Sequence, residues 1–396
     1  MKTLSRWILA LALVFSSALI HPNADPVNTP SAIADNSISL LPKSDVVAVL
    51  DVSRLVNDLL PKAKQAWPDQ VAKFEKEINE AVSDAAKNGV DLYKVKSLTI
   101  GLTLFGAKTT GAMIVEGLTI TPEMMAKENK ESTAIDYKGK TLYIEKSKPE
   151  PKPLVKGAAK NAPKGKARTV SKSQSKTGKA RPASAKAVSP ASGNNALSNV
   201  TDMASSMGTN LLKGNTAFVQ LDAERAAIGD EAEVKAVIDA LTEGANPTSN
   251  LGSELSAALQ ETKSTGLLRF AVNIPDSARQ AAQSEEFLKN LAVTKMVLGT
   301  LDVSDDMSLS LDAKLRTSSA EDATKLHESL AALLGLGKMM LGGNQDPMML
   351  MLNKLLDQIR ISPQTNDVSL AISVPRELYE TFLKSDPKAT PAKSDK

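Results

Sequence analysis

Cysteine is absent from this sequence, histidine occurs only twice, and aromatic residues make up 3% of the 396 positions. Without cysteine the chain can form no disulfide, no thiolate metal site and no anchor through a lipidated cysteine. Two histidines are too few for an imidazole-based zinc or iron centre. We therefore expect no cofactor and no metal, and a hydrophobic core built from aliphatic residues and methionine.

The first 34 residues have the three parts of a secretory signal peptide. Lys2 and Arg6 supply the positive charge, and residues 7–20 form an apolar run that is shorter than a membrane-spanning helix needs. Ala32–Ala34 offers small residues for cleavage before Asp35, and Ser16–Ala18 is an earlier alternative. The sequence predicts a protein that is exported to the periplasm or the extracellular space and keeps no transmembrane helix.

Catalysis by a serine or cysteine triad needs a histidine. His21 lies within the segment that cleavage after Ala34 removes, which leaves His327. The surrounding residues have the spacing of a helix with an apolar stripe, so His327 is interpreted as lying on the flank of that helix. We expect no catalytic residue and a protein that is not an enzyme.

Positive charge is concentrated in one segment. The net charge is +3, but residues 146–186 contain 13 lysines or arginines and one acid, a net of +12. Residues 1–34 add +1, so subtracting both from the total leaves −10 on the rest of the chain. The sequence indicates an acidic folded part with one basic insertion.

The insertion, about 147–195, is rich in Lys, Ala, Ser and Pro and holds no aromatic residue, which predicts disorder. Residues 140–145 and 216–221 flank it and have the composition of two strands of one hairpin. The segment is interpreted as a solvated spacer, or as a contact to an anionic envelope surface or polymer. Nucleic acid is a disfavoured partner, because the segment has no aromatic side chain on which a base could stack. The cations for an anionic surface are Lys152, Lys156, Lys160, Lys164, Lys166, Arg168, Lys172, Lys176, Lys179 and Arg181.

Apolar periodicity predicts the same order of elements twice: strand, helix, hairpin, helix, hairpin. We expect an α+β fold with antiparallel sheets, helices packed on one face, and two related halves from an internal duplication. The halves cover 35–262, including the insertion, and 263–388, and a disordered tail follows at 389–396. The clearest hairpin joins 294–303 to 307–315, and a capping box at Ser318–Glu321 begins a helix that extends to about Leu341.

Three stretches carry a resemblance: Leu41–Val47, Val52–Leu55 and Ile228–Asp239. They resemble an uncharacterised family of exported bacterial α+β proteins, and the similarity covers most of residues 40–262. The resemblance implies no activity, cofactor or catalytic residue.

Two clusters could carry a binding site. Asp302, Asp305 and Asp306 lie at a hairpin turn, where aspartate is common, and lack the spacing of a calcium loop. Five methionines gather near a helix end: Met339, Met340, Met348, Met349 and Met351. Their leucine neighbours favour core packing; an apolar groove for a lipid or a partner helix, and a Cu(I) site, are alternatives.

The sequence contains no motif that assigns a function. The leading hypothesis is a non-catalytic exported or cell-envelope protein that binds or scaffolds, with the basic segment as a tether. The alternatives are a hydrolase that uses paired carboxylates on envelope polymers, and a protein that binds an apolar ligand such as a lipid.

Overall fold

The structure is a computed structural model of the whole chain. It describes residues 36–68, 71–72, 79–80, 82–83, 86, 91–104, 109–119, 121, 132–145, 216–244, 252–284, 289–343, 347–378 and 380. The chain divides into two compact units, one comprising Met1–Ser147 with Met203–Lys396 and the other Lys148–Asp202. All described residues belong to the first unit. The expected signal peptide, most of the expected helix over 69–88, the basic insertion and the expected tail lie outside the described residues.

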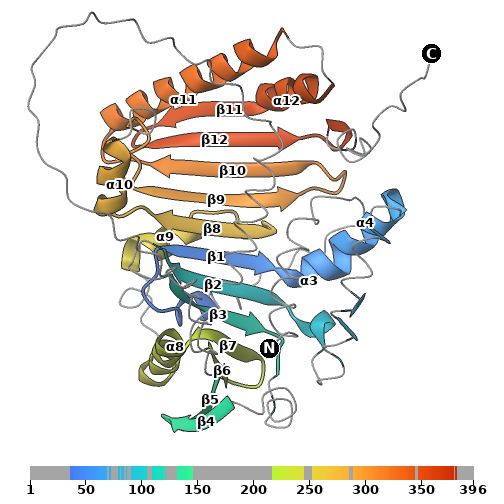
Figure 1. Cartoon of the computed structure of the whole chain (residues 1–396), viewed down its shortest axis with the longest axis vertical. Helices are drawn as coiled ribbons and strands as arrows, with labels where there is room; N and C mark the ends of the chain where they lie inside the picture. Colours follow the sequence, from blue (N-terminus) through green and yellow to red (C-terminus); the bar gives the residue numbers. More distant parts are fainter. Residues whose placement is uncertain are drawn as a thin grey trace, which may run out of the picture. The chain divides into compact units, whose positions relative to one another are not determined.

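One antiparallel sheet of twelve strands organises the first unit (Figure 1). Its order is β11-β12-β10-β9-β8-β1-β2-β3-β7-β6-β5-β4. The fold is α+β with antiparallel strands, as the sequence predicts. The strands are β1 (Val46–Asp51), β2 (Ser97–Thr103), β3 (Thr110–Glu116), β4 (Ser132–Tyr137), β5 (Lys140–Glu145), β6 (Thr216–Gln220), β7 (Arg225–Asp230), β8 (Leu268–Asn273), β9 (Met296–Val303), β10 (Leu309–Arg316), β11 (Ile359–Gln364) and β12 (Asp367–Val374).

The first strands of the two halves, β1 and β8, join them into a single sheet. These strands pair antiparallel, with Val46 opposite Val272 and Leu50 opposite Leu268. Outward from this pair, the order is β1-β2-β3-β7-β6 on one side and β8-β9-β10-β12-β11 on the other. The five strands of each half therefore occur in the same order, which agrees with an internal duplication.

The first half contains one hairpin more than the second. The β4–β5 hairpin extends the sheet beyond β6 and has no counterpart beyond β11. Strands β4 and β7 are not predicted from the sequence, which places the second hairpin of the first half at 140–145 and 216–221. The hairpin that corresponds to β11–β12 in the sheet is instead β6–β7. Strand β7 consists largely of small residues, and a Cβ at Gly229 would lie 2.3 Å from the carbonyl oxygen of Gly111. A strand selected for close backbone approach lacks the β-branched composition that identifies strands in a sequence.

The strands that flank the basic insertion are neighbours in the sheet. Strands β5 and β6 pair antiparallel from Leu142 opposite Val219 to Glu145 opposite Thr216. The expected hairpin pairing of these flanks is thus confirmed. The chain leaves the sheet after β5 and re-enters it on the adjacent strand, so the intervening residues connect two ends that are already close together.

One face of the sheet, called here the α8 face, carries Val47, Ile114 and Val219. Helices α8 (Glu231–Glu243) and α9 (Ser253–Gln260) cover it together with residues 36–41. Their buried side chains, among them Val237 and Leu259, form one continuous core with the strands. The sequence predicts helices on one face only, whereas the structure has helices on this face and on the opposite one.

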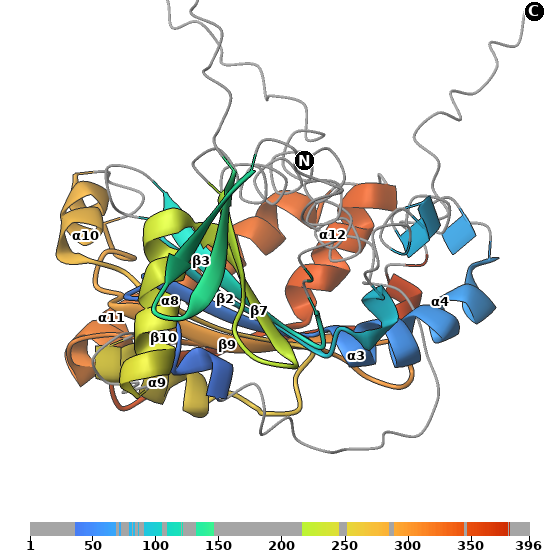
Figure 2. The same ribbon diagram turned by 90° about the horizontal axis from the view of Figure 1, so that it is seen from below.

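The opposite face, called here the α11 face, also has helices over it. Its first-half part packs against a continuous helical segment of α3 (Val52–Arg54), η1 (Leu55–Leu59) and α4 (Leu60–Ala66). Its second-half part packs against α11 (Ala320–Leu341). Figure 2 shows α9 and α12 (Pro347–Asp357) on opposite sides of the sheet. Strands with apolar residues on both faces need cover on both faces, which explains the additional helices.

Helix α11 begins one residue later than the capping box at Ser318–Glu321 predicts. The hydroxyl oxygen of Ser319, its N-cap, accepts a hydrogen bond from the backbone N–H of Asp322. This bond satisfies one of the free N–H groups of the first turn. The remaining short elements are η2 (Leu92–Lys94), before β2, and α10 (Asp276–Gln283), between β8 and β9.

Candidate binding surface on the α11 face

The α11 face of the second half consists largely of aliphatic side chains that are only partly buried. Residues directly opposite one another in an antiparallel ladder point to the same face of the sheet. The register of β9, β10, β12 and β11 therefore shows which side chains lie on the α11 face. We call the following half-buried set the second-half apolar surface: Leu301, Leu309, Leu311, Leu315, Ile359, Ile361, Leu370 and Ile372. Four adjacent strands contribute to it, and none of its members is polar.

The corresponding strands of the first half are buried on the same face. Leu98 on β2, Val115 on β3, Ile228 on β7 and Phe218 on β6 are each only 4% exposed. The two halves therefore share their strand order but differ in how completely the α11 face is covered. This difference marks the second half as the part of the described structure with apolar surface available for a ligand.

Helix α11 covers the surface fully only near its own N-terminus. Ala323 and Leu326 are completely buried against Val368 at one end of the strands. Further along the helix, Leu330, Leu333 and Leu334 are only half-buried. The cover over the sheet is therefore tight in the first two turns of α11 and looser beyond them.

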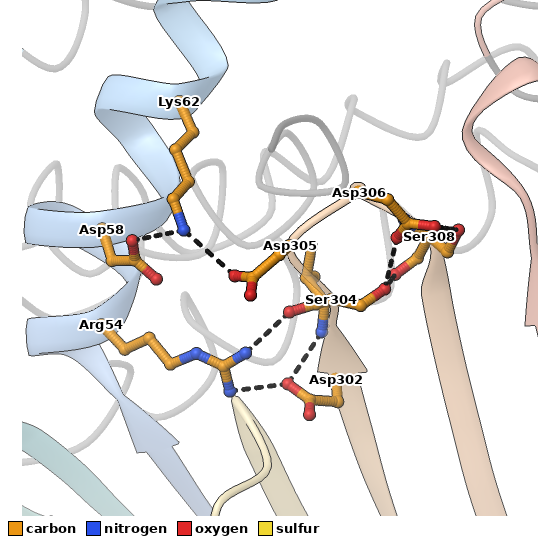
Figure 3. A network of polar contacts seen from close by, with 9 residues as sticks. Arg54, Asp58, Lys62, Asp302, Ser304, Asp305, Asp306 and Ser308 are labelled. Carbon is orange, nitrogen blue, oxygen red and sulfur yellow. Dashed lines mark hydrogen bonds and ion pairs between the residues drawn. The ribbon is translucent and has the colours of Figure 1, made fainter. Parts of the chain in front are cut away.

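A polar network fixes the helices at the other end of the strands (Figure 3). Arg54 in α3 extends to the end of β9, where its Nη1 donates to Asp302 Oδ1 at 2.6 Å. The same Nη1 donates to the carbonyl of Thr265, in the loop before β8, at 2.8 Å. Arg54 Nη2 donates to the carbonyl of Val303 at 2.7 Å. A helix of the first half is thereby held to the end of β9 in the second half.

Lys62 in α4 continues this network. Its ammonium nitrogen lies 2.6 Å from Asp58 Oδ1 and 3.3 Å from Asp305 Oδ1, and its side chain is 3% exposed (Figure 3). A buried ammonium group needs such partners to offset its desolvation. Asp302 and Asp305 thus serve as acceptors for cations of the first half.

Asp306 has a different role, within its own turn. It accepts hydrogen bonds from the backbone N–H of Ser308 and from the hydroxyls of Ser304 and Ser308. The backbone N–H of Ser308 and then the Ser304 hydroxyl hold the pKa of the Asp306 carboxyl below its ordinary value. Together with the ion pairs above, this accounts for the three aspartates as turn and bracing residues, and the described residues contain no group of three potential metal-binding side chains.

Met307 closes this turn in a conformation unusual for its residue type. Its φ angle is +71°, in the left-handed region, and its side chain is completely buried in the core beneath η1. The sequence pattern placed Met307 in the strand, but β10 begins two residues later, at Leu309. The turn directs this side chain inward at a backbone position that glycine or asparagine would normally occupy.

A second contact between the halves lies at Trp67, at the end of α4. Its Nε1 donates to Glu380 Oε1 at 3.1 Å, and the guanidinium of Arg376 stacks 5.1 Å from its ring centroid. The chain after β12 is thereby attached to the first half. Helix α4 and the residues after β12 thus lie together at one end of the apolar surface.

The methionine cluster separates into two groups. Met339 and Met340, at the end of α11, are 76% and 74% exposed, so the preferred interpretation of core packing is wrong for them. Met349 and Met351 in α12 are half-buried. Met348 belongs to α12, but its side chain lies outside the described part of the structure. The sequence could not distinguish these positions, because leucine and methionine occupy both the inner and the outer positions of the helices.

The carboxylates proposed for a hydrolase need a facing pair. Glu116 is buried on the α8 face and accepts hydrogen bonds from Ser37 Oγ at 2.5 Å and Ser97 Oγ at 2.7 Å. Glu145 and Asp230 lie on the opposite face, in register across β6, and each is 8% exposed. The sheet separates Glu116 from the other two, and a substrate would have to reach side chains that are almost fully covered.

His327 is half-buried on α11, the position expected for it. The ten cations of the basic insertion, Lys152 to Arg181, lie outside the described residues. Within the described part of the chain, no helix combines the length and the apolar character that crossing a membrane requires.

This geometry defines an α+β protein whose single antiparallel sheet carries a partly covered apolar surface. No protein-family model and no curated protein matches the chain. Two solved crystal forms of the bacterial protein TP0453 are distantly similar. Form I has a TM-score of 0.38 and 6% identity over 87% of this chain and 95% of that one. Form III has a TM-score of 0.40 and 7% identity over 91% and 98%. Similarity at this level assigns neither family nor function.

Proposed function

We propose that this chain is a non-catalytic exported protein of the cell envelope that binds an apolar ligand, the acyl chain of a lipid, on the second-half apolar surface. The observation that carries the proposal is the difference between the halves: the same face is buried in the first half and half-buried in the second. Export is proposed from the N-terminal sequence alone.

The chemistry of the surface favours an acyl chain. Leu309, Leu311 and Leu370 lie on adjacent strands and present only branched aliphatic groups. Burying apolar area releases roughly 25 cal/mol per Å², so a flexible hydrocarbon chain gains affinity from contact area without a specific hydrogen bond.

A lipid-binding assay tests the proposal. Delipidated full-length protein is titrated with a fluorescent fatty acid, and Leu311→Thr and Ile372→Thr are compared with the wild type. Each change places a hydroxyl on the apolar surface. We expect it to weaken fatty-acid binding about tenfold, because the hydroxyl would lose hydrogen bonds to water when the acyl chain covers it.

Ile228→Thr is the matched control, because Ile228 lies on the same face in the first half and is buried. It should reduce stability and leave the affinity for the fatty acid unchanged at a temperature where the variant is folded. An absence of binding by the wild type, or equal weakening by Ile228→Thr and Leu311→Thr, would contradict the proposal.

The basic insertion supports a second, compatible role as a tether. A segment of +12 on a chain that carries −10 outside residues 1–34 and 146–186 would attract anionic envelope polymers or surfaces that the acidic part repels. The attraction should fade as salt rises from about 0.05 to 0.5 M, because the Debye length shrinks below the spacing of extended charges.

A further inference from the structure

Large apolar side chains are exposed together at the α11–α12 hairpin. Leu336 is 51% exposed, Met339 76% and Met340 74%, and Leu350 in α12 is 47% exposed. We call these four residues the hairpin tip. Soluble proteins rarely expose several large apolar side chains side by side without a partner for them.

The outward face of α11 changes character along its length. Near the N-terminus it exposes Lys325 and Glu328. In the remaining turns it exposes Ala331, Ala332, Gly335, Leu336, Met339 and Met340, none of them polar. Leu336, Met339 and Met340 are spaced three and four residues apart and so share one side of the helix. The apolar character is therefore confined to the end of the helix that carries the tip.

The charges of the two helices balance, so the tip presents an uncharged apolar surface. Residues 329–357 contain two lysines, Lys338 and Lys354, and two aspartates, Asp346 and Asp357, and Lys338 pairs with Asp357 at 2.9 Å. Lys354 of α12 is exposed. A Cβ on Gly337 would lie 3.2 Å from Leu356 Cδ1, so α11 and α12 approach closely and present their outer side chains as one unit.

From this placement we infer that the hairpin tip docks on a lipid bilayer with anionic headgroups, its leucines and methionines entering the boundary between headgroups and acyl chains. Met and Leu side chains of this size partition into that boundary. The inference concerns the outer surface of the hairpin and stands whether or not the sheet face binds a ligand. A few side chains give only weak, reversible attachment, and the basic insertion supplies the second, electrostatic contribution.

Vesicle co-sedimentation of the full-length protein tests this surface. The double variant Met339→Ser/Met340→Ser is compared with the wild type on phosphatidylglycerol-rich and on phosphatidylcholine vesicles. We expect the wild type to prefer the anionic vesicles and the double variant to bind them about tenfold more weakly, because two exposed thioether side chains no longer enter the lipid.

Tyr93→Ser is the matched control, since Tyr93 is also a large apolar side chain, 52% exposed, but lies in η2 of the first half. It should bind vesicles like the wild type. All the changed side chains are exposed, so thermal melting should stay unchanged and show that the folds are intact. Equal vesicle binding by wild type and double variant would overturn the inference.

Sedimentation velocity without vesicles distinguishes the other possible partner of the tip. We expect the same monomer mass for wild type and double variant. A wild-type dimer that Met339→Ser/Met340→Ser dissociates would assign the tip to self-association and overturn the bilayer inference.

Discussion

Arg54 and Asp302, 248 positions apart in the sequence, form a 2.6 Å ion pair that links the first helical segment to the second half. The same guanidinium donates to two backbone carbonyls, of Thr265 and Val303. A planar group with several fixed donors suits such a junction better than a lysine would. The halves are therefore joined by side chains as well as by the β1–β8 ladder.

Removing this guanidinium should measurably destabilise the protein. Arg54→Ala loses three hydrogen bonds and is expected to lower the free energy of unfolding by about 2 kcal/mol, the range for bonds to charged groups. Urea denaturation measures it. Lys94→Ala is the control, because Lys94 is 75% exposed and its partner Asp91 lies 3.6 Å away, so its loss should change little. Equal effects of the two variants would exclude a bracing role for Arg54.

Met307 provides a test of backbone strain. Met307→Ala should lower the free energy of unfolding by about 2–5 kcal/mol, because it leaves a cavity in a packed core. Met307→Gly creates the same kind of cavity but relieves the left-handed backbone, which costs an L-residue about 1–2 kcal/mol. We expect the glycine variant to be the more stable of the two in urea denaturation. The reverse order would contradict a positive φ angle at this turn.

The Asp306 carboxyl should contribute to acid sensitivity. Its pKa is lower in the folded protein than the ordinary value near 4, so its contribution to stability is present above about pH 4 and is lost as the pH falls through the folded pKa. Asp306→Asn removes this titration. Urea denaturation at pH 7 and pH 3 should show a smaller difference between variant and wild type at pH 3, whereas an unchanged difference would argue against the ionised turn.

The α11 face is more completely covered in the first half than in the second, so truncating a side chain should lower the free energy of unfolding more in the first half. Ile228→Ala removes a buried side chain and should destabilise the protein by about 3 kcal/mol. Leu370→Ala, at a half-buried position on the same face of β12, should cost about half as much, because its neighbours are already partly solvated. Thermal and urea unfolding of the ligand-free protein measure both, and equal losses would mean that the second half is as tightly packed as the first.

Because β5 pairs with β6, we expect the protein to fold without the basic insertion. Replacing residues 148–202 by a short Gly/Ser loop should leave the melting temperature nearly unchanged, because loop-closure entropy depends weakly on length. Binding to anionic vesicles or cell-wall material should weaken and lose its salt dependence. A large drop in melting temperature would show that these residues stabilise the fold.

Local patterns in the sequence were sufficient to predict some helices and strands and insufficient to predict others. The alternation that begins at Met307 and the capping box at Ser318–Glu321 predict β10 and α11 to within two residues of their starts, because both patterns depend on near neighbours. Strand β7 could not be predicted because Ala226, Ala227 and Gly229 are not typical strand residues. Small residues are needed there by the close approach of the neighbouring strand, which the local sequence does not reveal. The exposure of Met339 and Met340 could not be predicted either, since the same two residue types line the inner side of the hairpin, and only the tertiary contacts of α11 decide which side faces solvent.

The central place of β1 in the sheet has a consequence for how the chain acquires its structure. Strand β1 is synthesised early, but one of its two neighbours, β8, emerges more than 200 residues later. Until then, the N-terminal half presents an open row of backbone donors and acceptors to any other extended chain. A nascent molecule is therefore prone to intermolecular association in this interval, and a chaperone that binds the unpaired edge of β1 would raise the yield of native protein.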